Sequence, residues 1–449
     1  MPLAVPSLDD YLNEDDLFVV SQGRGKPSSI RDQINKATWL IEHAKAARRI
    51  NRGEVLLILG AGAAGVSAAW KAVTLGINVV LYEFKAAAFP VQAACETRWL
   101  HPNEYLWPLP GCQQEHYPLD SEAKAAPPML KWSADRPCEV AARWREQFAA
   151  WAGRHEQEDY PNGYLAWLPG MHREFADRAD LRQHVREKFA EGACQMVLLC
   201  VGAEERGVAG SQHRSYRFWD SDPYETLHYG LPSLPPTGLR TLVSGGGDGA
   251  LQDFLRIACQ RPGAARPVQV LGLLKPLLHL LDRCPAYQPV KAAFQRWDET
   301  CHRPDPAALW AVLEKFVDEL TTTPQAAEIA GHLRHVIDPE LAAGRKVLHL
   351  NLAEGRFEQC FALNALLVRL FEWFLRQQGQ ATAFQPRAFI RAVNSDSVAH
   401  RCSADPVTGA GDCLLNPHRV AFHPNPSGTA VAERTYDVVV IRHGIEPLA

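Results

Sequence analysis

Short apolar runs, several of which end at a glycine, alternate along this chain with longer stretches whose apolar residues recur at helical spacing. The runs show little every-second-residue alternation, so we interpret them as parallel strands buried on both faces. These predicted strands are Val55–Leu59, Asn78–Tyr82, Met196–Gly202, Thr241–Val243, Pro267–Leu271 and Tyr436–Gly444. Predicted helices cover 30–49, Ala64–Leu75, Pro137–Ala152, Ala179–Ala190, a segment carrying Leu251, Phe254 and Ile257, and most of 276–380. Strands that alternate with helices predict an α/β fold.

The pattern is less regular toward both ends. Residues 1–27 are acidic and then rich in Gly, Pro and Ser, and we expect them to run over the surface. Near the other end, turn residues connect three further predicted strands, Phe389–Val393, Cys413–Phe422 and Thr429–Arg434.

A glycine-rich turn follows the first predicted strand directly, and its sequence is Gly60-Ala61-Gly62-Ala63-Ala64-Gly65. In a GxGxxG turn the first glycine permits the tight bend, and the second lets the backbone approach a pyrophosphate. The third lets the following helix pack closely on the strand. The N-terminus of that helix offers N–H groups and the positive end of a dipole to phosphate. The turn therefore predicts a dinucleotide site, although closing a tight turn is the alternative role of these glycines.

A carboxylate ends the second predicted strand. Glu83 stands eighteen residues after Gly65, where it can accept both hydroxyls of an adenosine ribose. A carboxylate there would repel a 2′-phosphate, so the first site favours FAD or NAD over NADP.

A second strand–glycine turn–helix segment begins near Leu239. Gly245, Gly247 and Ala250 have GxGxxA spacing, but Asp248 puts a carboxylate where phosphate would approach, with capping of the helix as its alternative role. If Pro267–Leu271 is the next strand, Gly272 takes the place of a ribose carboxylate. Lys275 could then meet a 2′-phosphate or simply lie at the surface.

The segment after Glu83 is rich in aromatic residues. By its position Arg98 could pair with phosphate, and the neighbouring aromatic residues could wall a cofactor ring. An aromatic loop packed on its own domain, with Arg98 at the surface, is the alternative.

The composition excludes several classes of protein. A net charge of −4, from 47 basic and 51 acidic residues, gives no reason to expect nucleic acid as a partner. No segment reaches the roughly 18 apolar residues of a membrane helix, so we expect a soluble cytoplasmic protein. Eleven cysteines without a CxxC favour reduced thiols and count against dithiol redox chemistry. His332 and His335 lack a third ligand, so we expect no metal.

Taken together, these motifs resemble the FAD-dependent flavoproteins with two dinucleotide-binding domains. The shared features are a GxGxxG turn with a trailing Glu83, an apolar strand ending at Gly202, a GxGxxA unit, and a terminal strand ending at Gly444. In that family an NAD(P)H domain interrupts the FAD domain, and strand ends at the positions of Gly202 and Gly444 return the chain to the FAD. The resemblance implies FAD as a cofactor, with NADPH as a candidate second cofactor.

The resemblance also implies a division of the chain into domains. Residues 1–52 would form an N-terminal extension and helix, and 53–235 the first part of the FAD-binding domain. Residues 236–395 would form a second Rossmann-like domain with a helical insertion over 276–380, and 396–449 the rest of the FAD-binding domain.

The function that follows is an FAD-dependent oxidoreductase, with an NAD(P)H-using monooxygenase acting on a small organic substrate as the narrower hypothesis. One alternative is an O₂-using oxidase without NAD(P)H, which Asp248 and Gly272 favour. Another is a non-catalytic FAD-binding protein with a regulatory or partner-binding role. The sequence identifies no catalytic residue and leaves the oligomeric state open.

Overall fold

A computed structural model describes most of the chain. The described residues are 7–12, 17–20, 29–109, 111–120, 122, 130–155, 163–171, 178–205, 207–208, 213, 215–222, 224, 239–259, 270–299, 305–353, 356–358, 360–380, 384–386, 388–395, 418–423, 432–443 and 445–447. The chain forms two compact units, one of residues 1–204 and 446–449 and one of residues 205–445. Each unit is described by itself.

The first unit is built on a parallel five-stranded sheet. Its order is β1-β7-β2-β3-β6, with bounds β1 Phe18–Val19, β2 Val55–Leu59, β3 Asn78–Glu83, β6 Leu165–Pro169 and β7 Met196–Leu199. Counted from β2, the strands β6, β3, β2 and β7 have the order 3-2-1-4 of a doubly wound nucleotide-binding half. The expected strands of the first unit are therefore present, in one sheet.

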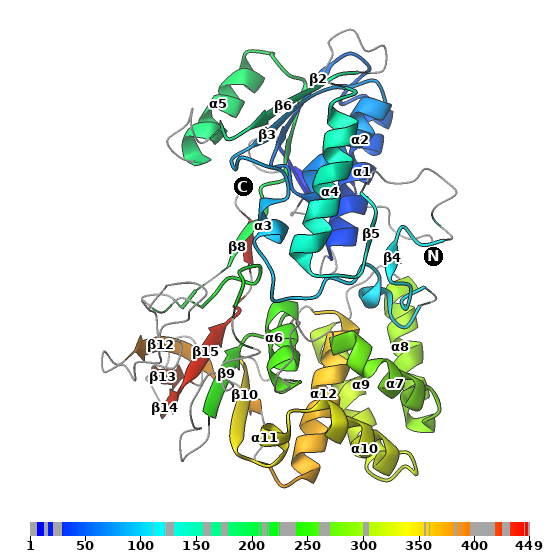
Figure 1. The fold of residues 1–449 in the computed structure, drawn as a ribbon, viewed down its shortest axis with the longest axis vertical. Helices are drawn as coiled ribbons and strands as arrows, with labels where there is room; N and C mark the ends of the chain where they lie inside the picture. Colours follow the sequence, from blue (N-terminus) through cyan, green and yellow to red (C-terminus); the bar gives the residue numbers. More distant parts are fainter. Residues whose placement is uncertain are drawn as a thin grey trace. The chain divides into compact units, whose positions relative to one another are not determined.

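Helices cover both faces of this sheet. Residues Leu56 and Ile58 share a core with α1 (Ile30–Ala46), α2 (Ala63–Thr74) and α4 (Pro137–Ala152), whereas Leu57 and Leu59 face α5 (Arg178–Ala190). Figure 1 shows α1, α2 and α4 side by side. Shorter elements are α3 (Pro90–Ala93), the 3₁₀ turns Leu8–Tyr11 and Glu104–Leu106, and the paired strands β4 (His116–Tyr117) and β5 (Trp132–Ser133).

The start of α1 lies where the sequence predicts it. Ser29 and Asp32 form a reciprocal capping box, in which the Ser29 side chain accepts from Asp32 N and the Asp32 side chain accepts from Ser29 N. The expectation that all of 1–27 runs over the surface is wrong, because Phe18 and Val19 form β1 and are buried in the core. Its two residues are too few for a periodic signal.

The second unit repeats the same strand order. Its parallel sheet is β11-β10-β9-β15, with bounds β9 Leu239–Ser244, β10 Lys346–Leu352, β11 Phe384–Pro386 and β15 Val438–Ile441. An antiparallel meander of β12 (Phe389–Ser395), β13 (His418–His423) and β14 (Ala432–Tyr436) packs on the face that carries Leu242 and Val439. The fold is therefore α/β, with two Rossmann-like units of which the second carries a helical insertion.

Helices occupy the other side of the second unit (Figure 1), and α6 packs directly on β9 and β10. Their bounds are α6 Asp248–Ala258, α7 Val270–Asp282, α8 Gln288–Glu299, α9 Pro306–Leu320, α10 Ala326–Val336, α11 Pro339–Ala342 and α12 Ala362–Gln377, with a 3₁₀ turn at Pro285–Tyr287. Among the described residues, no helix has both the length and the apolar composition needed to cross a membrane.

One predicted strand is wrong, and one strand was missed. The described part of Pro267–Leu271 belongs to α7, and the strand that follows β9 in the sheet is β10, inside the stretch predicted to be mostly helical. Periodicity cannot distinguish a short buried strand from the apolar start of a helix, and residues 270–274 are all apolar or glycine. Because Gly272 lies in α7, its comparison with Glu83 is also wrong.

The terminal strand joins a different sheet from the one expected. β15 pairs with β9, so the end of the chain up to Ile445 belongs to the second unit rather than to a returning FAD domain. A buried parallel strand has the same apolar pattern in either sheet, and the pattern carries no information about its neighbour. The short strands β8 (Ala203–Glu205) and β16 (Ile445–Pro447) pair where the chain passes from one unit to the other.

Candidate functional site

The first glycine turn is tightly packed at two of its three glycines. A Cβ on Gly60 would lie 2.5 Å from Cys200 O, and φ is +96° at this residue. A Cβ on Gly65 would lie 1.9 Å from Gly60 O. Both positions therefore require glycine, one for the bend and one for the approach of α2 to β2.

Gly62 differs from the other two glycines. It is the N-cap of α2, has no side-chain cap, and no neighbouring atom lies within 4 Å of an ideal Cβ built on it. Ala63 and Ala64, which follow, add only methyl groups at the first turn of the helix. The first N–H groups of a helix lack intrahelical partners, so an open N-terminus without competing side chains suits a phosphate.

Glu83 stands beside this turn with its carboxylate already oriented. It is buried, and Ala61 N and Lys85 N donate to its two oxygens at 2.8 Å each. Each carboxylate oxygen can accept a further hydrogen bond. The group is therefore held at the end of β3, in the place where a dinucleotide puts its adenosine ribose.

Two other predicted site residues of the first unit are described. Arg98 is 3% exposed, so the alternative that placed it at the surface is wrong. Asn103, in the same segment, donates through Nδ2 to Gln114 O and His116 O at 2.8 Å each, which orders the loop. Gly202 has φ +76° and no atom within 4 Å of an ideal Cβ, and Gly444 lies outside the described residues.

The described cysteines are free thiols. Cys200 lies against the glycine turn, and burial raises its pKa, which keeps the thiol protonated. Cys138 N donates to Cys95 O at 3.1 Å, so these two residues are neighbours in space although they are distant in sequence. Burial also raises the pKa of Cys138.

We expect alkylation of the accessible thiols to leave the reduction and reoxidation of the predicted flavin unchanged. The reason is that burial raises the pKa of Cys138 and Cys200, which disfavours the thiolate that dithiol redox chemistry requires. The measurement is stopped-flow absorbance before and after iodoacetamide treatment. Lost turnover in a protein that keeps its circular dichroism spectrum would contradict this expectation.

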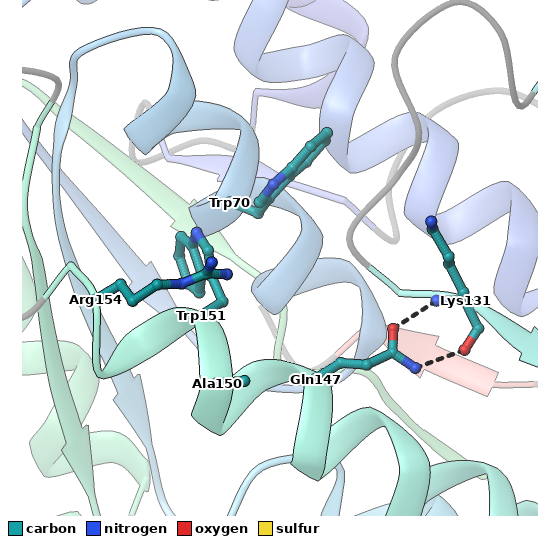
Figure 2. Close-up of a pocket in the computed structure, with 6 residues that line it drawn as sticks. All are labelled: Trp70, Lys131, Gln147, Ala150, Trp151 and Arg154. Carbon is teal, nitrogen blue, oxygen red and sulfur yellow. Dashed lines mark hydrogen bonds between the residues drawn. The ribbon is translucent and has the colours of Figure 1, made fainter.

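One pocket in the first unit lies away from the glycine turn. It encloses about 410 Å³ and is lined by Trp70, Lys131, Gln147, Ala150, Trp151 and Arg154 (Figure 2). Trp70 stands seven residues beyond the start of α2, which is about 10 Å along the helix at 1.5 Å per residue. The pocket contains none of the predicted site residues.

The glycine turns of the two units make equivalent backbone hydrogen bonds, each within its own unit. In the first unit Gly60 N donates to Tyr82 O at 2.8 Å. In the second unit Gly245 N donates to Asn351 O at 3.0 Å. Gly245 therefore corresponds to Gly60, and the residue after Asn351 corresponds to Glu83.

A second hydrogen bond fixes the fourth strand in the same register. Cys200 N donates to Leu59 O at 2.7 Å, and Arg442 N donates to Ser244 O at 2.7 Å. A Cβ on Gly245 would lie 2.1 Å from Arg442 O, as a Cβ on Gly60 would lie against Cys200 O. Gly247 is the N-cap of α6 and has the extended conformation of Gly62. The backbone of the first glycine turn is therefore repeated in the second unit.

The ribose position of the second unit carries no acid. By this register the residue equivalent to Glu83 is Leu352, which is 1% exposed. Arg356 follows four residues later and is exposed. An arginine near an acid-free ribose position is the arrangement that accommodates a 2′-phosphate. Lys275, the residue that the sequence suggested for a 2′-phosphate, lies on α7.

Asp248 does not direct its carboxylate along its own helix. Its Oδ1 accepts from Phe361 N and from Asn364 Nδ2, both at 2.8 Å, at the start of α12. Burial raises the pKa of this carboxyl to about 7, although the two hydrogen bonds oppose the rise. The side chain therefore links the N-termini of α6 and α12, a role that local sequence signals do not reveal.

A buried ionic network holds α6 in place. Asp253 accepts from Arg256 Nη1 at 2.9 Å and from Arg442 Nε at 2.9 Å. Arg256 also binds Asp222 at 3.1 Å, and Arg442 Nη1 donates to Tyr216 O at 2.6 Å. All four charged residues are buried, so breaking one pair would leave an uncompensated charge. The network fixes the helix whose N-terminus forms the second turn.

No protein-family model and no curated protein sequence matches this chain. Among solved structures, thioredoxin reductase from T. acidophilum has a TM-score of 0.34 at 10% identity, covering 88% of this chain and 77% of that one. Thioredoxin reductase from Lactococcus lactis has a TM-score of 0.33 at 9% identity, with 88% and 79% covered. A 2-naphthoyl-CoA reductase has a TM-score of 0.31 at 10% identity, with 88% and 34% covered. These values are low, and the function proposed below depends on the residues of this chain.

Proposed function

We propose that this protein is an FAD-dependent oxidoreductase that takes its electrons from NADPH. The observation that carries the proposal is the pairing of an open N-cap at Gly62 with the preoriented carboxylate of Glu83. Gly62 and the first turn of α2 would hold the pyrophosphate of FAD, and Glu83 would accept the adenosine ribose hydroxyls. When bound, FAD supplies the electron-transfer chemistry, and the chain supplies binding and orientation.

Support for NADPH comes from the second unit. Its glycine turn repeats the backbone of the first, and Asp248 is engaged with α12. Leu352 occupies the position of the ribose acid, and Arg356 stands four residues later, beyond Glu354. Gly272 and Asp248 no longer favour an oxidase without NAD(P)H. Gly272 lies in α7 and not at the ribose position, and Asp248 accepts a hydrogen bond from α12.

A monooxygenase acting on a small organic substrate is the narrower form of the proposal. The free thiols among the described residues favour oxygen over a disulfide as the electron acceptor. The test is the absorbance spectrum of the purified protein, followed by anaerobic addition of NADPH and then of air. A flavin spectrum bleached by NADPH and restored by oxygen is the expected result. A colourless protein that does not take up added FAD would refute the proposal.

Replacing Arg356 with alanine is expected to weaken NADPH binding by about tenfold to a hundredfold and to leave NADH binding unchanged. The reason is the loss of a charge-assisted hydrogen bond to the 2′-phosphate, which is worth about 1.5–3 kcal/mol. The measurement is a calorimetric titration with each nucleotide. Arg334→Ala, at an exposed position on α10, is the matched control. Equal losses for NADPH and NADH would contradict this role for Arg356.

A further inference from the structure

The face of the second sheet that the meander covers ends in polar side chains. Leu242 and Val439 pack on the meander, and His349 Nδ1 is 2.9 Å from the hydroxyl of Tyr436 in β14. On the same face, Ser244 on β9 and Asn351 on β10 stand two residues beyond Leu242 and His349. His443 stands four residues beyond Val439, after the end of β15. Because the three strands are adjacent and parallel, these side chains meet at the carboxyl edge of the sheet.

The three side chains form one hydrogen-bonded chain. Asn351 Nδ2 donates to Ser244 Oγ at 2.9 Å, and Ser244 Oγ is 2.8 Å from His443 Nε2. Ser244 and Asn351 are each 1% exposed, whereas His443 is only partly buried. Asn351 Oδ1 is buried and has no hydrogen-bond partner among the described residues.

The equivalent positions of the first unit hold no serine, asparagine or histidine. The register that equates Gly245 with Gly60 equates Ser244, Asn351 and His443 with Leu59, Tyr82 and Val201. Those three residues pack in the apolar core. Burying polar groups costs free energy unless they are hydrogen-bonded, so the fold does not require this cluster. It is a feature of the second unit alone.

The hydrogen bonds define which nitrogen of His443 carries the proton. Among the described residues Ser244 Oγ has two side-chain partners, Asn351 Nδ2, from which it accepts, and His443 Nε2. We therefore assign the Ser244 hydrogen to His443 Nε2, with Nε2 as the acceptor. Burial lowers the pKa of His443, which favours the neutral ring. The single proton of the ring is then on Nδ1, so His443 offers one N–H donor on the side away from Ser244.

The cluster lies at the point where the strand order reverses. β9 and β15 are the first and fourth strands, and a dinucleotide crosses the sheet between such strands. The ribose position at the end of β10 marks the adenosine half of that ligand. The other half must extend toward the end of β15, where His443 stands.

We propose that His443 donates its Nδ1–H to an oxygen of the nicotinamide half of NADPH, with Ser244 and Asn351 as positioning residues. This inference rests on the proposed use of NADPH by the second unit. It assigns the two halves of the ligand to different residues, the 2′-phosphoadenosine to Arg356 and the nicotinamide nucleotide to His443.

The test compares two ligands on the full-length protein. NADPH contains both halves, whereas adenosine 2′,5′-bisphosphate lacks the nicotinamide half. We expect His443→Ala to weaken NADPH about tenfold and to leave adenosine 2′,5′-bisphosphate unchanged, the size of effect of one neutral hydrogen bond. Ser244→Ala should weaken NADPH several-fold in the same selective way. Titration calorimetry measures both ligands.

Two conservative variants test which ring nitrogen of His443 donates to NADPH. His443→Asn places an amide N–H near the position of Nδ1 and should retain part of the NADPH affinity, whereas His443→Gln places it near Nε2 and should not. His335→Ala, at an exposed position on α10, is the control. Equal losses for both ligands, unchanged NADPH binding, or a wild type that does not bind NADPH would overturn the inference.

Flavin absorbance separates this inference from the proposed function. A yellow wild type that does not bind NADPH refutes the role of His443 while the flavin assignment stands. A protein that takes up no FAD but binds NADPH through His443 refutes the oxidoreductase and leaves the inference intact. Each variant is first checked by circular dichroism. If a His443 variant loses its fold, the NADPH titration of Ser244→Ala tests the inference instead.

Discussion

Replacing Gly62 with valine is expected to abolish flavin binding while leaving the first unit folded. Gly62 has φ −74° and ψ −174°, which valine adopts without strain, and no neighbouring atom lies within 4 Å of the new Cβ. The branched side chain would instead fill the space beside the first turn of α2, where we place the pyrophosphate. The measurement is the flavin absorbance of the purified variant, with circular dichroism to follow the fold.

A matched control distinguishes the site from a general effect of the substitution. Gly331 on α10 also has no atom within 4 Å of an ideal Cβ, so Gly331→Val should keep the full yellow spectrum. Glu83→Ala should weaken FAD binding by about 1.5–3 kcal/mol, the scale of a charge-assisted hydrogen bond. A folded Gly62→Val protein with unchanged flavin content would show that the pyrophosphate does not lie at this turn.

The first glycine turn was predictable because every part of it is local in sequence. The strand, the glycines, the helix and Glu83 fall within about thirty residues, and each has its own signal of apolar pattern, turn residue or charge. In the structure Gly60 and Gly65 have the close contacts that their spacing implied. The role of the turn in binding FAD stays a prediction.

The second unit was less predictable because its parts are distant in sequence. The strand that follows β9 in the sheet begins at Lys346, after the helices α6 to α11, and the apolar start of α7 has the sequence pattern of a strand. The ribose position could therefore be located only from the hydrogen bond between Gly245 and Asn351. The contacts among Ser244, Asn351 and His443 join residues about a hundred or more positions apart, and no local pattern signals such a cluster.

The sequence and the structure lead to different expectations for the Asp248 charge. From the sequence, its charge opposes a phosphate at the N-terminus of α6. In the structure, Oδ1 accepts from Phe361 N and Asn364 Nδ2, so the charge is directed to α12. Removing that charge should therefore change the stability of the second unit much more than its affinity for NADPH.

The pH dependence of stability follows from the direction of the pKa shift. Burial raises the pKa of Asp248 from 3.8 to about 7, so the folded protein holds this proton over a range in which the unfolded chain has lost it. The contribution to stability is full below pH 3.8 and is lost as the pH rises to about 7. At 1.36 kcal/mol for each pKa unit, the loss is about 4 kcal/mol at most.

Asp248→Asn keeps an oxygen that can accept from Phe361 and Asn364 but cannot ionise. We expect the second unit of this variant to be more stable than wild type at pH 8, with little difference at pH 4, in urea unfolding followed by tryptophan fluorescence. Asp318→Asn, at an exposed position on α9, should leave the pH dependence unchanged. NADPH affinity should change by less than about threefold, because the carboxylate bonds to α12. A tenfold gain in affinity would instead mean that the charge faces the phosphate, as the sequence alone suggests.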